Sequence, residues 1–155
     1  MKLEFLIIDP QNDFTNPKGS LFVTGADQDS IRLAEVLTRL KKKINDIHVT
    51  LDTHHKLAIF HPMFWVDSHG NHPAPFTMIA AKDVETGKWR STNPQFQKRA
   101  ADYVRSLDKN KRYVLVVWPE HCLIGTWGHN VVDPIQKALF EGLMIYRPFS
   151  QDVLP

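Results

Sequence analysis

The sequence predicts an α/β fold, a three-layer αβα sandwich around a mainly parallel β-sheet. Apolar runs of strand length alternate with stripes of helical period, and the early strands each end on a polar residue. This alternation is typical of βαβ units, whose strands pair in parallel under covering helices. The 155 residues, 43% of them hydrophobic, are enough for one sizeable core, so we expect a single domain over residues 1–155.

Eight elements are predicted along the chain. In order, they are a strand at 3–8, a helix over 31–44, a strand at 47–51, a small strand at 76–79, a helix over 94–107, a strand at 113–117, a helix over 130–139 and a strand at 143–146.

The first three elements predict a right-handed βαβ unit. The first strand ends at Pro10, which fixes φ and lacks an N–H. The first helix carries a stripe of aliphatic residues and is expected to be capped near Asp27 or Asp29. Because each strand leads to an aspartate, we expect Asp9 and Asp52 at the same carboxyl edge of the sheet.

A long loop insertion is expected at about residues 53–93. This segment combines prolines, histidines and aromatic residues with little periodicity apart from its small predicted strand. Loops of this length inside a compact domain are usually functional or inserted. We expect it to form a lid or wall over the edge that carries Asp9 and Asp52.

The later elements restore the alternation of helices and strands. A helix is expected to begin near Pro94, since proline is favoured in the first turn. The apolar strand after it leads into the turn at 118–122, while a helical stripe and a four-residue apolar run predict the last two elements. The turn at 118–122 follows a strand and is therefore expected at the same sheet edge as Asp9 and Asp52.

Composition excludes some partners. A net charge of +2 is too small to argue for nucleic acid, and no apolar run approaches the roughly 20 residues that span a bilayer. The single cysteine cannot form an internal disulfide. Nothing at Met1 resembles a secretory signal, so we expect a cytoplasmic protein that binds neither nucleic acid nor membrane.

Asp52, His54 and His121 are the candidate metal ligands. Asp52 and His54 stand two residues apart just past a strand, where an irregular backbone lets both turn toward one ion. Three protein ligands with open positions are typical of a catalytic metal site rather than a structural one. His61, seven residues after His54, is the candidate for a fourth ligand. The alternative is that eight histidines produce this spacing by chance and form ordinary hydrogen bonds.

Asp9 is the candidate catalytic carboxylate. At the end of a buried strand it would be partly desolvated, which suits a group that takes or gives a proton. Alternatively, Asp9 or Asp13 only caps the following turn through an Asx hydrogen bond. The residues alone leave both interpretations open.

Cys122, Phe14 and Trp118 have weaker claims. Cys122 stands beside His121, which invites a nucleophile role. Sequence neighbours rarely face the same pocket, however, and a lone cysteine near a strand end is most often a small buried apolar residue. Phe14 and Trp118 would serve either as flat walls for an aromatic ring or as core residues.

The chain resembles the nicotinamidase branch of the isochorismatase-like cysteine hydrolases. The resemblance runs from Leu3 to about Tyr146. It is carried by Ile8-Asp9-Pro10-Gln11-Asn12-Asp13-Phe14, Gly19-Ser20-Leu21, Val23-Thr24-Gly25, Asp52-Thr53-His54 and Trp118-Pro119-Glu120-His121-Cys122 followed by Gly125-Thr126. Asp-x-His followed by Trp-Pro-x-His-Cys is the more specific, metal-binding part of this set.

The resemblance implies a Rossmann-like fold that hydrolyses an amide such as nicotinamide to a carboxylate and ammonia. A cysteine nucleophile, an aspartate base and a lysine do this in the family, with a divalent metal, zinc first and iron or manganese as alternatives, near the pyridine nitrogen. The implied roles are Asp9 as catalytic aspartate, Asp52, His54 and His121 as metal ligands, and Phe14 and Trp118 as substrate-ring contacts. His61 lies where some members place another ligand, although its spacing differs. Cys122 matches the structural cysteine of the metal motif rather than the nucleophile.

The chain departs from the family pattern in its last part. The family's lysine would follow the strand predicted at 143–146 and its nucleophilic cysteine would come later, but no lysine follows Lys137 and no cysteine follows Cys122. We therefore expect a fold truncated at its C-terminus, with one sheet edge exposed and favouring a homo-oligomer. Such a chain would carry the Asp and metal half of a hydrolase site. The alternatives are a non-catalytic metal- or ligand-binding remnant, or a related hydrolase whose substrate is not a pyridine.

Overall fold

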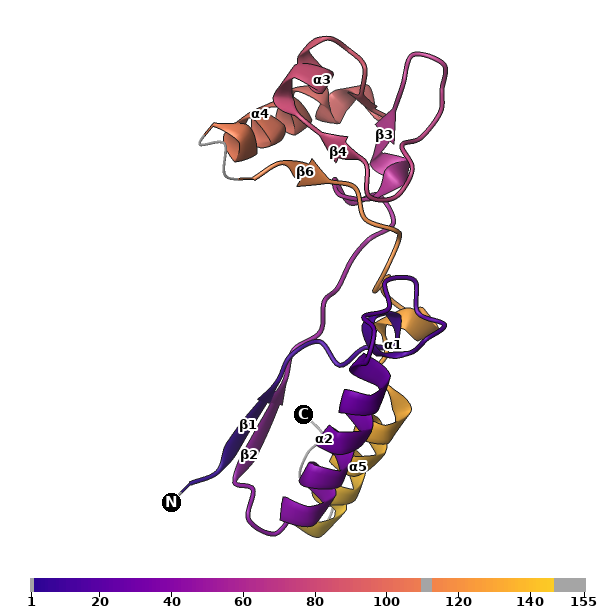
Figure 1. Ribbon diagram of the computed structural model, residues 1–155. Helices are drawn as coiled ribbons and strands as arrows, with labels where there is room; N and C mark the ends of the chain where they lie inside the picture. Colours follow the sequence, from indigo (N-terminus) through magenta and orange to yellow (C-terminus); the bar gives the residue numbers. More distant parts are fainter. Residues whose placement is uncertain (1, 110–112, 147–155) are drawn as a thin grey trace, which may run out of the picture. The chain divides into compact units, whose positions relative to one another are not determined.

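The computed structural model describes residues 2–109 and 113–146 (Figure 1). The described chain forms two compact units. The first consists of residues from Met1–Thr53 and Ile124–Pro155, and the second of His54–Leu123. Each unit has a hydrophobic core of its own.

A parallel pair of strands and two long helices form the first unit. Strands β1 (Glu4–Ile7) and β2 (Asp46–Val49) pair in parallel, with Glu4 opposite Asp46. Helix α2 (Ala26–Leu40) joins them in the chain and lies beside α5 (Asp133–Tyr146) (Figure 1). The strand, helix, strand order and the parallel pairing predicted for residues 3–51 are therefore present.

Helix α2 starts with a glycine rather than with a side-chain cap. Gly25 has a φ of +88°, a left-handed conformation that glycine adopts without a Cβ clash. The N-cap predicted near Asp27 or Asp29 is wrong, since the cap residue is Gly25 and no side-chain cap hydrogen bond forms. Both aspartates lie in the first turn, where their charges favour the helix dipole.

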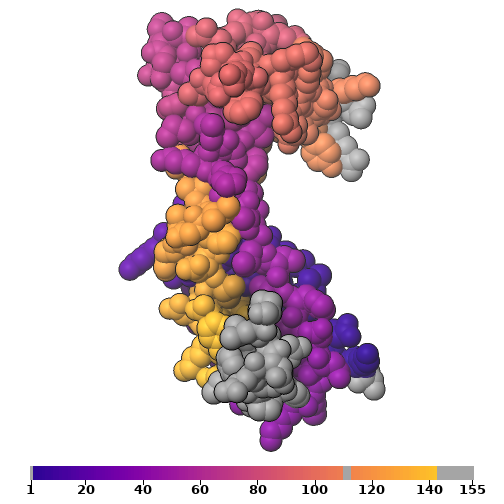
Figure 2. All heavy atoms as spheres, turned by 180° about the vertical axis from the view of Figure 1, so that it is seen from behind, coloured from indigo at the N-terminus to yellow at the C-terminus, as the bar shows by residue number. Residues whose placement is uncertain are grey.

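Aliphatic residues from β1, α2 and α5 and from the segments next to these helices build the core of the first unit. Its buried members are Ile7, Leu37, Ile44, Val132, Ile135 and Ala138. Burying one leucine or isoleucine side chain stabilises a fold by about 1.5–3 kcal/mol. Atoms of α5 also reach the surface (orange to yellow in Figure 2), and Phe140 on this helix is exposed.

Short elements connected by turns form the second unit. In chain order they are the 3-10 helix η1 (Pro62–Phe64), β3 (Trp65–Val66), β4 (Met78–Ile79), α3 (Ala81–Glu85), β5 (Arg90–Ser91), η2 (Pro94–Phe96), α4 (Gln97–Asp108) and β6 (Leu115–Val116). Strand β3 pairs with β5, and β4 with β6, both antiparallel. Eight buried residues form the core: Phe64, Trp65, Ile79, Val84, Ala100, Val104, Leu115 and Val117. The segment 53–93, expected as a long loop, thus contributes several short elements and half of this core.

One expectation for the later elements is wrong. Residues 143–146 belong to helix α5 instead of a strand. A run of four apolar residues fits a buried helix as well as a strand, so periodicity could not decide. Strand β6 pairs with β4 and not, within the described residues, with β1 or β2. A single mainly parallel sheet therefore stays a prediction.

The outer face of the parallel pair is exposed within the described residues and carries polar as well as apolar side chains, namely Glu4, Leu6, Asp46 and His48. Leu6 and Ile8 on this face are exposed, whereas Ile7, on the opposite face, is buried.

No helix in the described part of the chain is long and apolar enough to cross a membrane.

Candidate metal centre

Three histidines of the second unit lie together. The ring centroids of His54 and His121 are 4.9 Å apart. The ring centroid of His61 lies 5.7 Å from that of His54 and 5.4 Å from that of His121. The backbone holds two of them in place, because the His54 N–H donates to the Cys122 carbonyl over 3.0 Å. A parallel bridge between His54 and Leu123 continues this contact. Residues 67 positions apart in the chain are thereby placed side by side.

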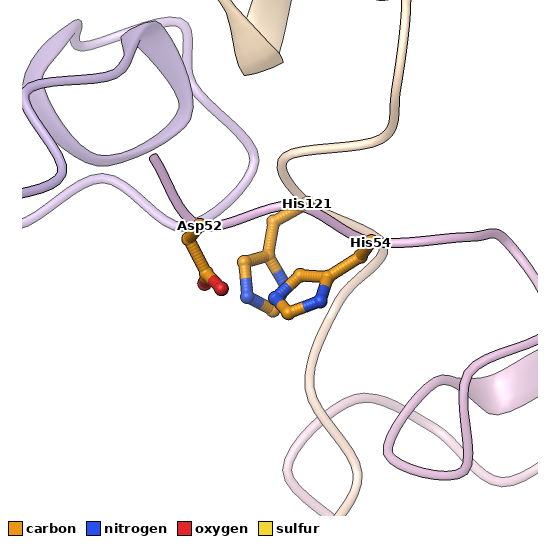
Figure 3. A group of neighbouring side chains, drawn as sticks. All are labelled: Asp52, His54 and His121. Carbon is orange, nitrogen blue, oxygen red and sulfur yellow. The ribbon is translucent and has the colours of Figure 1, made fainter. Parts of the chain in front are cut away.

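Asp52 joins two of these histidines in a potential ligand set. One ligand atom from each of Asp52, His54 and His121 lies within 4.8 Å of the others, and the three side chains point toward one another (Figure 3). Ligand atoms around a tetrahedral zinc ion lie about 3.4 Å apart, given bonds of about 2.1 Å. Small side-chain rotations would close that difference, so the donor set fits a divalent ion.

Gln11 fixes the backbone of Asp52. Its amide oxygen accepts the Asp52 N–H over 2.7 Å, and its amide nitrogen donates to the Asp52 carbonyl over 2.8 Å. Gln11 is completely buried. The sequence motif contains Gln11, but nothing in its spacing indicated that it holds a ligand-bearing segment 41 positions away.

Backbone carbonyls set the tautomers of two histidines. Nδ1 of His121 lies 2.7 Å from the Pro119 carbonyl, and Nδ1 of His61 lies 3.2 Å and 3.3 Å from the carbonyls of His55 and Lys56. A carbonyl oxygen only accepts, so each Nδ1 carries the proton and each Nε2 is the unprotonated nitrogen. An unprotonated Nε2 is the form in which histidine binds a metal.

His61 is the most buried member of the group. Its Nε2 is buried and has no hydrogen-bond partner among the described residues. Burial lowers the pKa of His61 from its usual value, the charges of His121 and His54 lower it further, and the carbonyls of Lys56 and His55 partly oppose the shift. A neutral, buried imidazole with an unused nitrogen fits a fourth ligand, although His61 lies outside the three-residue set.

Asp9 lies in the first unit, after β1. Its φ is +47°, which is uncommon for a residue with a Cβ. The Thr50 hydroxyl donates to Oδ1 of Asp9 over 2.6 Å, and the Asp9 N–H donates to the Thr50 carbonyl over 3.2 Å. Asp9 and Asp52 thus follow neighbouring parallel strands, as their order in the sequence predicted.

Asp13 binds a backbone N–H seven residues further along the chain. Its Oδ1 accepts the Ser20 N–H over 3.0 Å. The carboxylate also packs so closely on Gly128 that a Cβ there would overlap it. The two carboxylates therefore have different partners, since Asp13 accepts from the Ser20 N–H and Asp9 accepts from the Thr50 hydroxyl.

The remaining candidates lie in different surroundings. Trp118 is 39% exposed in the second unit, which excludes a core role. Phe14 is half-buried in α1 (Asn12–Thr15) of the first unit. Cys122 is completely buried at a φ of +48°, as expected for a structural cysteine.

Comparisons with known proteins point in one direction. No family model matches the chain. Over 134 residues it is 28% identical to the nicotinamidase of Saccharomyces cerevisiae, a match that covers 86% of this chain and 50% of that protein. The solved structure of the yeast nicotinamidase Pnc1p is similar with a TM-score of 0.56 and 22% identity, over 91% of this chain and 53% of its own.

Two further structures agree. Pnc1p bound to the inhibitor nicotinaldehyde gives a TM-score of 0.55 at 22% identity, over 91% of this chain and 53% of that chain. A nicotinamidase of Acinetobacter baumanii gives 0.51 at 24% identity, over 86% and 46%. The fold is α/β, of the kind these enzymes have. The chain is similar to nicotinamidases, and it spans about half the length of the relatives it matches.

Proposed function

We propose that the chain carries the aspartate and metal half of a nicotinamidase-like amide hydrolase. The observation that supports this most is the grouping of Asp52, His54 and His121, which are ligand types in a motif order found in that family. The similarity to the yeast enzyme supports a small-molecule amide such as nicotinamide as substrate. A cytoplasmic location and a homo-oligomeric state belong to the same proposal.

Zinc is the proposed metal, with iron and manganese as alternatives. Imidazole and carboxylate donors suit all three ions, and three protein ligands leave positions open for water or substrate. His61 is proposed as an additional ligand because its Nε2 is buried without a partner among the described residues. When bound, the ion would supply Lewis-acid polarisation and water activation.

Asp9 is proposed as the proton acceptor of the reaction. In the complete enzyme it would take the proton of a cysteine thiol, and the thiolate would attack the carboxamide carbon. The proton would then pass from Asp9 to the leaving nitrogen, ammonia would depart, and water would release the carboxylate from the thioester. The Thr50 hydroxyl, 2.6 Å from Oδ1, would hold the Asp9 carboxylate in a fixed orientation. Phe14 and Trp118 are proposed to contact the ring of the substrate.

Zinc binding tests the metal half directly. We expect the chain to take up about one Zn²⁺ in a competition titration against a chromophoric chelator, and His121→Ala to weaken binding by about a hundredfold or more, since it removes a direct ligand. His69→Ala is the matched control, because His69 is exposed in the same unit. Equal affinity of the wild type and His121→Ala would refute the metal site.

Ammonia release tests whether this chain contains the nucleophile of the reaction. We expect no ammonia from nicotinamide with this chain alone, because the thiol of Cys122 is completely buried. Release that is lost on Cys122→Ser and kept in the control Ser106→Ala would assign the nucleophile to Cys122 and overturn our assignment.

Two simple measurements distinguish the proposed amide hydrolase from two alternative functions. The half-length match favours a non-catalytic metal- or ligand-binding remnant as the second candidate, and an intact mass of 17.9 kDa for the native gene product would support it over the enzyme. A related hydrolase with a non-pyridine substrate would bind Zn²⁺, yet nicotinate would not compete for its pocket.

A further inference from the structure

Phe76 is a bulky residue in a left-handed backbone conformation. Its φ is +68°, a region that side chains with a Cβ rarely occupy, and the residue is 58% exposed. The described chain has two other non-glycine residues at positive φ, Asp9 and Cys122. One is the candidate catalytic aspartate and the other adjoins a candidate metal ligand. Backbone conformations of this kind cluster at functional sites, which suggests a functional role for Phe76 as well.

The β4–β6 pairing holds Phe76 next to Trp118. The Phe76 N–H donates to the Val117 carbonyl, and the Val117 N–H donates to the Thr77 carbonyl over 2.8 Å. The rings of Phe76 and Trp118 meet edge to face, with centroids 5.8 Å apart and an interplanar angle of 84°. Two exposed aromatic rings are thus fixed by backbone hydrogen bonds rather than by burial.

Phe60 connects this aromatic pair to the histidines. The Trp118 N–H donates to the Phe60 carbonyl over 2.7 Å. The Phe60 ring packs edge to face on His54 at 4.6 Å and on His61 at 4.8 Å. The pair therefore adjoins the three histidines within the second unit.

We propose that Phe76 is a specificity-determining residue that forms, with Trp118, an aromatic wall for the flat ring of the substrate. The inference rests on the proposed function, which supplies a planar heteroaromatic amide as ligand. An edge-to-face pair presents one ring face and one ring edge, and a planar ring packs against such a pair better than a saturated ring does. The backbone conformation at position 76 turns this side chain out of the strand toward Trp118 and solvent.

Ligand titration of the zinc-loaded full chain tests whether Phe76 and Trp118 contact the ring of the substrate. We expect Phe76→Gly to weaken nicotinamide binding by about threefold to tenfold, the size of a lost aromatic pair, with Zn²⁺ uptake unchanged. Glycine relieves the positive φ, so the variant keeps the fold. Phe76→Tyr keeps the ring and should bind as the wild type does. Tyr103→Ala removes a similarly exposed ring from α4 and should have no effect.

A second ligand separates ring recognition from general packing. The wild type should prefer nicotinamide over cyclohexanecarboxamide, and Phe76→Gly should lose most of that preference. Unchanged affinity and preference in Phe76→Gly would overturn the inference while leaving the proposed function intact. A zinc-loaded wild type that binds no nicotinamide would instead defeat the proposed function, and the inference with it. A change confined to self-association would assign Phe76 to a protein contact and also overturn it.

Discussion

His61 is completely buried, yet only one of its two ring nitrogens has a hydrogen-bond partner among the described residues. Nδ1 donates to backbone carbonyls, whereas Nε2 has no partner among the described residues. A buried polar atom without a partner costs about 1–3 kcal/mol. The second unit carries this cost within contact distance of His54 and His121, as expected of a group retained for binding an ion rather than for packing.

The pKa of His61 predicts how the stability of the metal-free chain depends on pH. Because the folded-state pKa lies below 6.5, the unfolded chain binds more protons between the two values, and stability rises with pH there. His61 thus contributes full stability above about pH 6.5 and loses it as the pH falls. We expect the urea-derived free energy of unfolding, measured with a chelator present, to fall between pH 7.5 and pH 5.

Replacing the imidazole provides the control for that expectation. His61→Gln cannot titrate, so its stability should change less over this pH range than that of the wild type. His69→Gln, at an exposed position, should behave as the wild type does. Identical pH profiles for the wild type and His61→Gln would show that the imidazole of His61 does not titrate in this way.

The candidate site was predictable where the residue type and the short spacing carry the chemistry. Asp52 and His54 are two residues apart, and His121 lies in a motif with its own signature, so the sequence indicated all three before their grouping was known. The clamp of Gln11 on Asp52 and the burial of His61 were not predictable, because both arise from packing. The exposed pairing of Phe76 with Trp118 was not predictable from the sequence either, for the same reason.

At the scale of elements, the long helices were predictable and the short strands were harder. Helices α2 and α4 each carry a stripe of helical period along more than two turns, which fixes their type. Among the described residues, four of the six strands have only two residues, too few for an alternating pattern to be recognised. The strand predicted at residues 143–146, which form the end of α5, is wrong for the same reason, since four apolar residues define no period.

At the scale of the whole molecule, the described residues form two hydrophobic cores, while the single domain expected from the length stays a prediction. One core is built by helices α2 and α5 with β1, the other by α3, α4 and the short strands. The sequence could not indicate this division, because the segment 54–123 has no linker-like composition at either end. Units with separate cores can unfold in separate transitions.

A matched pair of core substitutions tests this division. Ile79 in the second core and Ile135 in the first are both almost completely buried, so each Ile→Ala change should cost about 2–5 kcal/mol. In scanning calorimetry we expect two transitions, with Ile79→Ala lowering the Tm of one and Ile135→Ala that of the other. Added Zn²⁺ should raise chiefly the transition that Ile79→Ala lowers, because His54, His61 and His121 belong to the second unit and only Asp52 of the candidate ligands belongs to the first. A single transition that both substitutions lower equally would mean that the two cores unfold as one cooperative unit.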